Sequence, residues 1–350
     1  MLRSREKLLM AIAQRLTDHV PLLPDSEHSA FLVACCRLLH NLSVGASAEL
    51  DTRFLARVLN GCGAILDAPS HGPELRAICV ALVGKLLPNC PPKQICDWCA
   101  QKQVKQVSNS NCRQPLISFY DTEEEHSRDL EKDPHDFTVP DRCQLLISCL
   151  DHLNAPLLRR STSGAGQISP RLNKTERQNE AKKSMLLHGS LKALASIVPN
   201  VESVRFAIGD ERRRCRKLVK LLRARKLEDE EEEESNEEAN RSKCLGPATP
   251  QHDFILAGNV CLVLMNCIAD TPLAEHLLGT NAIQDLLMLI QNSENQCRSN
   301  AAILASRLAM ANQEHREEIQ RLDGWGILNR ACGYLHQKPS IASMFAQRRI

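Results

Sequence analysis

One helical layout recurs along this chain and constrains its fold more than any single motif does. Each copy has an Ala- and Leu-rich helical stretch, a polar break, a short helix ending near Gly, and a second apolar helix. The copies recur with a period of about 41–43 residues. A single unit of this kind cannot cover its own apolar face, so we expect neighbouring units to stack and share one core. The related segments lie over 37–44, 81–89, 193–209, 263–290 and 304–331.

Hydrophobic periodicity predicts an all-α fold. Apolar residues recur at i, i+3, i+4 and i+7 in most of the chain, and no convincing run alternates as a strand would. Hydrophobic residues make up 43% of the chain but aromatic residues only 3%. The apolar mass therefore comes mainly from Leu, Ala, Ile, Val and Cys, which suits closely packed helices.

Three polar stretches interrupt the helical pattern, at 106–141, 159–183 and 227–252. Each has too few apolar residues to offset the entropy of ordering it, and each is far longer than a usual connection. We therefore expect a polar loop, a flexible linker and an acidic disordered insertion in a regular helical scaffold. The remaining segments are N-terminal helical repeats over 1–105, a helix over 142–158, one repeat over 184–226 and further repeats over 253–350.

Glycines punctuate the repeats. Gly209 and Gly279 each follow a short apolar segment, where a glycine can end a helix in the left-handed conformation that other residues resist. We expect both residues to adopt that conformation.

The repeat resembles the armadillo family. LLHNLSV at 38–44 and LMNCIAD at 264–270 match the Asn-bearing helix of that family, and KLVKLL at 217–222 and DLLMLI at 285–290 match its closing helix. The match is best over about 184–336 and weaker over 29–105. The resemblance implies a right-handed α-solenoid of the armadillo type, or of the related HEAT type, that binds protein partners in its groove.

The resemblance also implies which residues line that groove. The family's Asn position falls on Asn41, Ser196, Asn266 and Arg307, and a partner-binding role would be to hydrogen-bond the backbone of an extended peptide or helix. The chain departs from the family pattern at Ser196, Arg307 and Gly84. The alternative role for Ser196 and Asn266 is to cap or bridge neighbouring helices.

A second, looser resemblance concerns residues 184–336. Their Cys-rich helices, NCIAD segment and few aromatic residues look like the C-terminal armadillo region of tetratricopeptide-repeat co-chaperones that assist cytoplasmic assembly of axonemal dyneins. That resemblance implies chaperones and dynein chains as partners, although the chain holds no recognisable tetratricopeptide unit. A general armadillo adaptor for signalling, cytoskeletal or nuclear partners is the alternative.

Charge is balanced overall but strongly patterned locally. The chain has 44 basic and 42 acidic residues, and its net charge of +2 predicts no bulk attraction to nucleic acid. Residues 211–226 are strongly basic, and residues 228–238 are strongly acidic. The basic segment is a solvated helix face, or a patch over which the acidic run folds back in competition with an acidic ligand. Nucleic-acid binding through this helix is a third alternative, which the adjacent acidic residues and the lack of interleaved aromatic residues disfavour. The candidate patch is Arg212, Arg213, Arg214, Arg216 and Lys217.

The 16 cysteines do not predict a disulfide framework. Most lie in apolar helical runs, where Cys acts as a small buried hydrophobe, and the chain starts without a secretory signal; we therefore expect a cytoplasmic protein. The alternative is a zinc site made of Cys90, Cys96, Cys99 and Cys112, although the second CxxC or HxxxH that such sites usually have is missing.

Nothing in the sequence predicts catalysis or membrane insertion. The Gly-rich SGAGQ at 163–167 lacks the strand and the GK[ST] of a phosphate-binding loop. No hydrolase or metalloprotease motif is present, so we expect neither an enzyme nor a cofactor. No apolar run reaches the roughly 20 residues that a membrane span needs.

Overall fold

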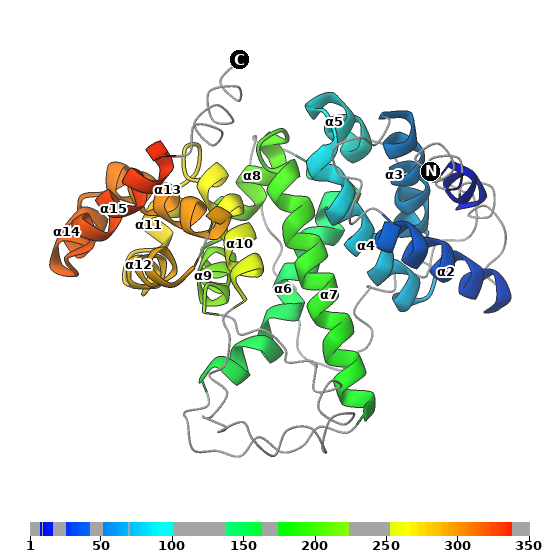
Figure 1. The fold of residues 1–350 in the computed structure, drawn as a ribbon, viewed down its shortest axis with the longest axis horizontal. Helices are drawn as coiled ribbons and strands as arrows, with labels where there is room; N and C mark the ends of the chain where they lie inside the picture. The colour runs from blue at the N-terminus through cyan, green and yellow to red at the C-terminus, as the bar shows by residue number, and fades with distance from the viewer. Residues whose placement is uncertain are drawn as a thin grey trace.

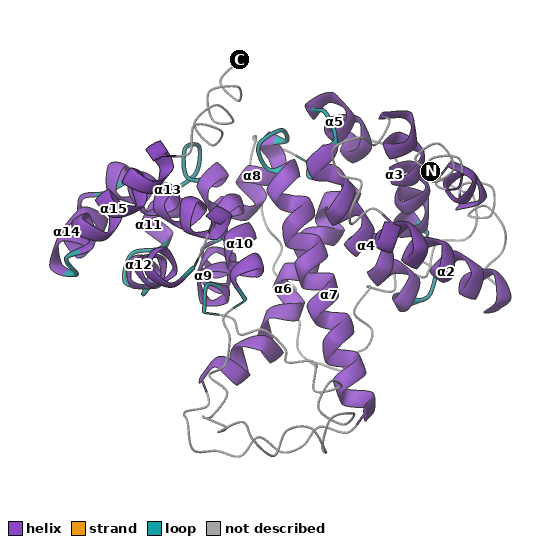
Figure 2. Ribbon diagram, viewed as in Figure 1, coloured by secondary structure: helices purple, strands orange, loops and turns teal. Residues whose placement is uncertain are grey.

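Helices form all the regular structure in the part of the chain that the computed structural model describes, as predicted (Figure 2). None of the helices in this part is long and apolar enough to cross a membrane. The predicted acidic insertion lies outside the described residues, as do residues 106–137 and 163–173 of the other two polar stretches. The structure describes residues 8, 10–16, 26–42, 52–68, 71–100, 138–162, 174–223, 253–293 and 295–337.

Five helices pack one after another into what we call the central row. Each helix of the row contacts the next, although shorter helices intervene in sequence. Figure 1 shows α6 and α7 in the middle of the molecule, with the earlier helices towards one end and the later helices towards the other. The row consists of α2 (Ser26–Leu42), α4 (Pro73–Leu86), α7 (Lys174–Ile197), α10 (Phe254–Cys267) and α13 (Asn295–Ala311).

A second set of helices covers the row. These helices are α3 (Thr52–Asp67), α6 (Asp141–Thr162), α9 (Arg212–Leu221), α12 (Ala282–Asn292) and α15 (Gly324–Gln337). Within this set, α3 contacts α6, α6 contacts α9 and α12 contacts α15, while α3, α6, α9 and α12 each pack on a row helix.

Short helices connect the row to its cover. They are α5 (Pro92–Ala100), α8 (Glu202–Gly209), α11 (Leu273–His276) and α14 (Gln313–Arg321), and a 3-10 turn, η2 (Leu87–Asn89), precedes α5. From α4 to α15, a row helix, a short helix and a covering helix therefore follow one another in each successive unit. The predicted order of helices within the repeat is confirmed for α7 to α15.

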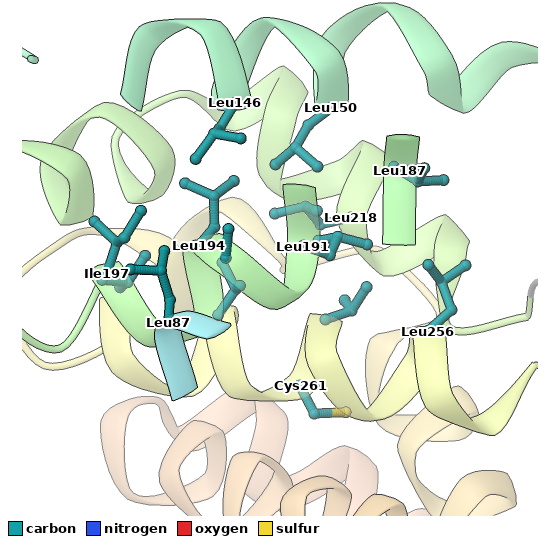
Figure 3. Close-up of a cluster of buried hydrophobic side chains, with 14 of the residues drawn as sticks. Leu87, Leu146, Leu150, Leu187, Leu191, Leu194, Ile197, Leu218, Leu256 and Cys261 are labelled. Carbon is teal, nitrogen blue, oxygen red and sulfur yellow. The ribbon is translucent and has the colours of Figure 1, made fainter. Parts of the chain in front are cut away.

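Leucine-rich helix faces form the core between the two sets. Figure 3 shows Leu146 and Leu150 of α6 beside Leu191 and Leu194 of α7, all of them fully buried. Cysteines fill small spaces in the same core, as predicted. The described cysteines are all free thiols, and every one except Cys96 is buried.

Three side-chain hydrogen bonds link the last two units at nearly the same sequence separation. Asn300 Nδ2 donates to the carbonyl of Gly258, 42 residues away, at 3.1 Å. Arg307 Nη1 donates to the carbonyl of Met265, also 42 residues away, at 2.6 Å. His315 Nε2 lies 2.8 Å from the carbonyl of Ala274, 41 residues away. These separations match the predicted period.

The contact between α4 and α7 brings two glycines together. A Cβ atom on Gly84 would lie 2.5 Å from the carbonyl oxygen of Gly189, and one on Gly189 would lie 2.8 Å from Ala81 Cα. Both distances are shorter than real Cβ contacts. Only glycine at these positions lets the two backbones approach so closely.

Two sequence-based boundaries were wrong. α6 continues to Thr162, and α7 begins at Lys174, so much of the predicted linker over 159–183 is helical. The segment KTERQNEAKK has few apolar residues, but Lys, Glu, Arg, Gln and Ala are strong helix formers. Helix propensity extends α7 beyond the point where an apolar pattern could reveal it.

The two glycines singled out in the sequence differ in conformation. Gly279 has φ +68°, which confirms its predicted left-handed conformation. Gly209 is not among the described glycines with positive φ, so that prediction was wrong. A Cβ atom at Gly209 would instead collide with the side chain of Thr271, so glycine is needed there for close packing of α8 against the following unit.

A buried ion pair joins α3, α5 and α6. Arg142 binds the carboxylate of Asp67 through Nε at 3.0 Å and Nη2 at 2.6 Å, and its Nη1 donates to the carbonyl of Trp98 at 2.9 Å. The guanidinium also lies 5.3 Å from the centroid of the Trp98 ring, and Trp98 Nε1 donates to the carbonyl of Leu59 at 2.9 Å. A Cβ atom on Gly63 would fill the space that the guanidinium occupies.

We predict that R142M destabilises the protein strongly. Methionine keeps much of the apolar volume but leaves the Asp67 carboxylate, whose exposed fraction is 16%, without its partner. Loss of one member of a buried pair lowers the free energy of unfolding by about 3–5 kcal/mol. Urea unfolding followed by circular dichroism measures the change.

The matched control is R37M, which breaks the Arg37–Glu74 pair between side chains that are 61% and 44% exposed. An exposed pair contributes about 0–1 kcal/mol. Equal destabilisation by the two variants would contradict the structural role of the buried pair.

We also predict that G84A and G326A shift stability in opposite directions. The methyl group added by G84A would push α4 away from the backbone of α7, and overpacking of this kind costs about 1–3 kcal/mol. Gly326 lies in α15, where a Cβ atom would have nothing within 4 Å. Alanine there gains up to about 1 kcal/mol of helix propensity. Thermal unfolding of the two variants checks the difference, and a gain of stability in G84A would refute the tight contact.

Candidate functional site

The central row carries all four residues predicted to line a groove. Asn41 lies on α2, Ser196 on α7, Asn266 on α10 and Arg307 on α13, so these residues lie on four different helices of one row. Asn41 is exposed, and the other three are half-buried. Four of the five row helices therefore carry one of these polar side chains outside the fully buried core.

Ser196 and Asn266 bind backbone groups of their own helices. Asn266 Nδ2 donates to the carbonyl of Leu262 at 2.8 Å, and Ser196 Oγ donates to the carbonyl of Lys192 at 3.4 Å. Within the described part of the chain, the amide oxygen of Asn266 has no hydrogen-bond partner. That oxygen can accept a hydrogen bond from a partner's backbone.

Arg307 and Asn41 have different surroundings. The bond from Arg307 Nη1 to the carbonyl of Met265 bridges α13 and α10, so Arg307 stabilises the row itself. Its guanidinium has five N–H donors, and one bond leaves others for a ligand. Asn41 Oδ1 lies 3.5 Å from Nδ1 of the neighbouring His40. The sequence analysis left open that Ser196 and Asn266 bridge neighbouring helices. In the structure, Arg307 forms such a bridge.

The row also holds a basic cluster that the sequence analysis missed. Lys85 Nζ of α4 lies 3.3 Å from His40 Nδ1 and donates to the carbonyl of His40 at 3.2 Å. Burial, and then the charge of Lys192 on α7, lowers the pKa of Lys85. Burial lowers the pKa of Lys192 as well. We call His40, Lys85 and Lys192 the basic cluster. The sequence feature that could have revealed the basic cluster is a lysine within an apolar helical run, Lys85 in ALVGKLL and Lys192 in SLKALAS.

The structure divides the basic patch predicted on α9. Arg214 binds the Asp151 carboxylate of α6 through Nε at 3.1 Å and Nη2 at 2.7 Å, and Lys217 Nζ donates to the carbonyl of Asp151 at 2.7 Å. Arg216 Nε donates to the carbonyl of His276 at 3.3 Å. These three side chains therefore hold α9 against its neighbours.

Only part of the predicted patch remains exposed as a ligand surface. Arg212 and Arg213, in the first turn of α9, are both exposed. The acidic run predicted to compete there, at 228–238, lies outside the described residues. The sequence alone could not distinguish the exposed arginines from the paired basic residues, because Arg214 is paired with Asp151, which lies 63 positions away.

The cysteines of the alternative zinc site have separate partners. Cys90 Sγ donates to the carbonyl of Leu86 at 3.4 Å, and Cys96 Sγ donates to the carbonyl of Asn200 at 3.5 Å. Burial raises the pKa of Cys90 to about 11, which favours the thiol over the metal-binding thiolate. Cys112 lies outside the described residues. No His, Cys, Asp and Glu group suited to a metal ion occurs among the residues that the structure describes.

Comparison with known proteins does not identify a family. No protein-family model matches the chain, and no curated protein matches it significantly in sequence. The argument for its function therefore rests on the row and its side chains.

We predict that the two halves of the α9 patch respond differently to mutation. R214A removes a bidentate, partly buried bond to Asp151, whose side chain is 28% exposed, and we expect a loss of about 1–3 kcal/mol in the free energy of unfolding. The control is R213A, which removes an exposed charge next in sequence and should change stability by less than about 0.5 kcal/mol. Urea unfolding checks both values; equal effects would contradict the division of the patch.

Proposed function

We propose that this chain is an armadillo-like α-solenoid that acts as a non-enzymatic, protein-binding scaffold or adaptor. The observation that carries the proposal is the central row, in which four of five consecutively packed helices carry a polar side chain that is exposed or half-buried. An extended peptide or a helix of a partner would lie along the row.

The unit structure supports an armadillo-like type over a HEAT-like type. From α4 onwards each unit has a row helix, a short helix and a covering helix, and armadillo repeats have three helices where HEAT repeats have two. Three hydrogen bonds between the last two units span 41 or 42 residues, which agrees with the repeat length of this class. Stacked units of this kind form extended binding surfaces.

The row side chains suit an extended partner. A peptide backbone offers one donor and one acceptor for nearly every residue, and its hydrogen bonds must be satisfied when it is buried. The amide oxygen of Asn266 can accept such a bond, and the remaining N–H groups of Arg307 can donate one. Contacts of this kind hold the backbone without demanding one particular sequence.

For the biological role, we propose co-chaperone work in the cytoplasmic assembly of axonemal dyneins. Its support is the resemblance of residues 184–336 to the armadillo region of such co-chaperones. Chaperones and dynein chains would then be the partners. A general adaptor for signalling, cytoskeletal or nuclear partners uses the same surface, so the identity of the captured proteins separates the two roles.

Affinity capture from ciliating cells, followed by mass spectrometry, tests the proposal with matched variants. Asn266 and Asn292 each donate to the carbonyl four residues earlier in their own helix, at 2.8 Å and 3.0 Å. Only Asn266 lies on the central row; Asn292 is the last residue of α12. N266A and N292A therefore lose the same local bond on different surfaces.

We predict that N266A weakens partner binding about 3- to 10-fold, the effect of one net hydrogen bond. N292A should bind as the unmodified chain does, and both variants should unfold at similar urea concentrations. Recovery of chaperones with dynein chains supports the assembly role, and recovery of other proteins supports a general adaptor. Equal capture by N266A and N292A would count against the row as the contact surface.

A further inference from the structure

The close backbone approach of α4 and α7 at Gly84 and Gly189 has an electrostatic consequence. The Gly84–Gly189 contact draws α4 and α7 together. Lys85 directly follows Gly84, and Lys192 lies three residues after Gly189, on the same side of α7. The packing that needs the glycines therefore also brings two lysines near each other.

A third basic group joins them from α2. Lys85 Nζ lies 3.3 Å from His40 Nδ1, and burial, followed by the charges of Lys85 and Lys192, lowers the pKa of His40. Three successive row helices thus contribute one basic side chain each. All three side chains are half-buried rather than freely solvated.

Neither lysine of the basic cluster forms an ion pair with a carboxylate in the described part of the chain. Other basic side chains of these helices do contact carboxylates: His188 Nε2 of α7 lies 2.7 Å from Asp253 Oδ2, and Arg37 of α2 pairs with Glu74 at 2.6 Å. The two lysines repel each other, and burial removes part of the water that would screen them. A bound anion would relieve both effects.

We propose that His40, Lys85 and Lys192 form a subsite that binds Asp or Glu side chains of an acidic segment in a protein partner. This inference rests on the proposed function of the row as a protein-binding surface. Exposed Asn41 lies next to His40, and Ser196 lies one turn after Lys192, so hydrogen-bonding groups flank the cluster on both outer helices. They can hold the backbone of the segment while its carboxylates face the lysines.

The size and composition of the cluster favour an acidic peptide over a nucleic acid. Three basic groups match one or two carboxylates, whereas binding along a phosphate backbone uses longer basic tracks. Single-stranded nucleic acids also stack on aromatic side chains, and only 3% of this chain is aromatic.

Fluorescence anisotropy with a short fluorescein-labelled peptide of alternating Glu and Ser tests the subsite on the full chain. K85Q and K192Q should each weaken binding about 3- to 10-fold, and the double variant should weaken it further. The control K220Q removes an exposed lysine of α9, on the covering set, and should bind as the unmodified chain does. A peptide with Gln in place of Glu should bind weakly to every form.

Stability separates binding from a structural role. Because K192Q removes one of two like charges, its melting temperature should stay the same or rise while its peptide affinity falls. Unchanged affinity in K85Q and K192Q would overturn the proposal. Binding of an oligothymidylate that depends more on Lys85 and Lys192 than peptide binding does would also overturn it, in favour of a nucleic-acid site.

The same variants in the capture experiment distinguish failure of the subsite from failure of the row. If N266A loses partners while K85Q and K192Q retain them, the row binds proteins but the acidic subsite is refuted. If none of the three variants loses partners, the row itself is not the contact surface. Loss of partners in K85Q and K192Q, but not in K220Q, supports the subsite.

Discussion

The contact between α4 and α7 is the constraint on which the rest of the structure depends. These two helices are neighbours in the row, although 87 residues separate Leu86 from Lys174 and much of that stretch lies outside the described residues. Gly84 and Gly189 allow their backbones to meet. That contact lets the units before α4 and after α7 share one core, and stacked units are not stable alone.

Polar side chains then set the register of each unit against its neighbours. Arg142 ties α6 to α3 and α5, Arg214 ties α9 to α6, and Arg307 ties α13 to α10. In each case a guanidinium reaches a carboxylate or a backbone carbonyl of another helix. Apolar surfaces alone tolerate sliding, whereas directional bonds to fixed acceptors favour one arrangement. Arginines that look like surface charges in the sequence therefore hold the stack in place.

The same tight packing gives the row its chemical character. Close approach of α4 and α7 places Lys85 and Lys192 under mutual repulsion, and α2 adds His40. Further along the row, Asn266 of α10 and Arg307 of α13 contribute neutral and cationic hydrogen-bonding groups. A partner that lay along the whole row would meet a basic subsite at α2, α4 and α7 and hydrogen-bonding groups at α10 and α13.

Local sequence patterns were a good guide where the cause of the structure is local. The spacing of apolar residues identified the helices, the repeat period matched three bonds between the last two units, and Gly279 adopts its predicted left-handed backbone. Patterns failed where a distant residue decides the outcome. Gly209 is needed because Thr271 packs against it, and Arg214 is not a free cation because Asp151 of α6 binds it.

The sequence by itself determined that the chain is helical, that its helical layout recurs and that most of the described cysteines are buried, because helix periodicity and burial are encoded over a few turns of chain. Only the tertiary structure decided which polar residues share a surface. Lys85 and Lys192 are 107 positions apart, and nothing in either local segment indicates the other. Gly84 and Gly189 let α4 and α7 approach closely, and this approach brings the two lysines near each other. Such a contact forms only when the helices of the row pack together.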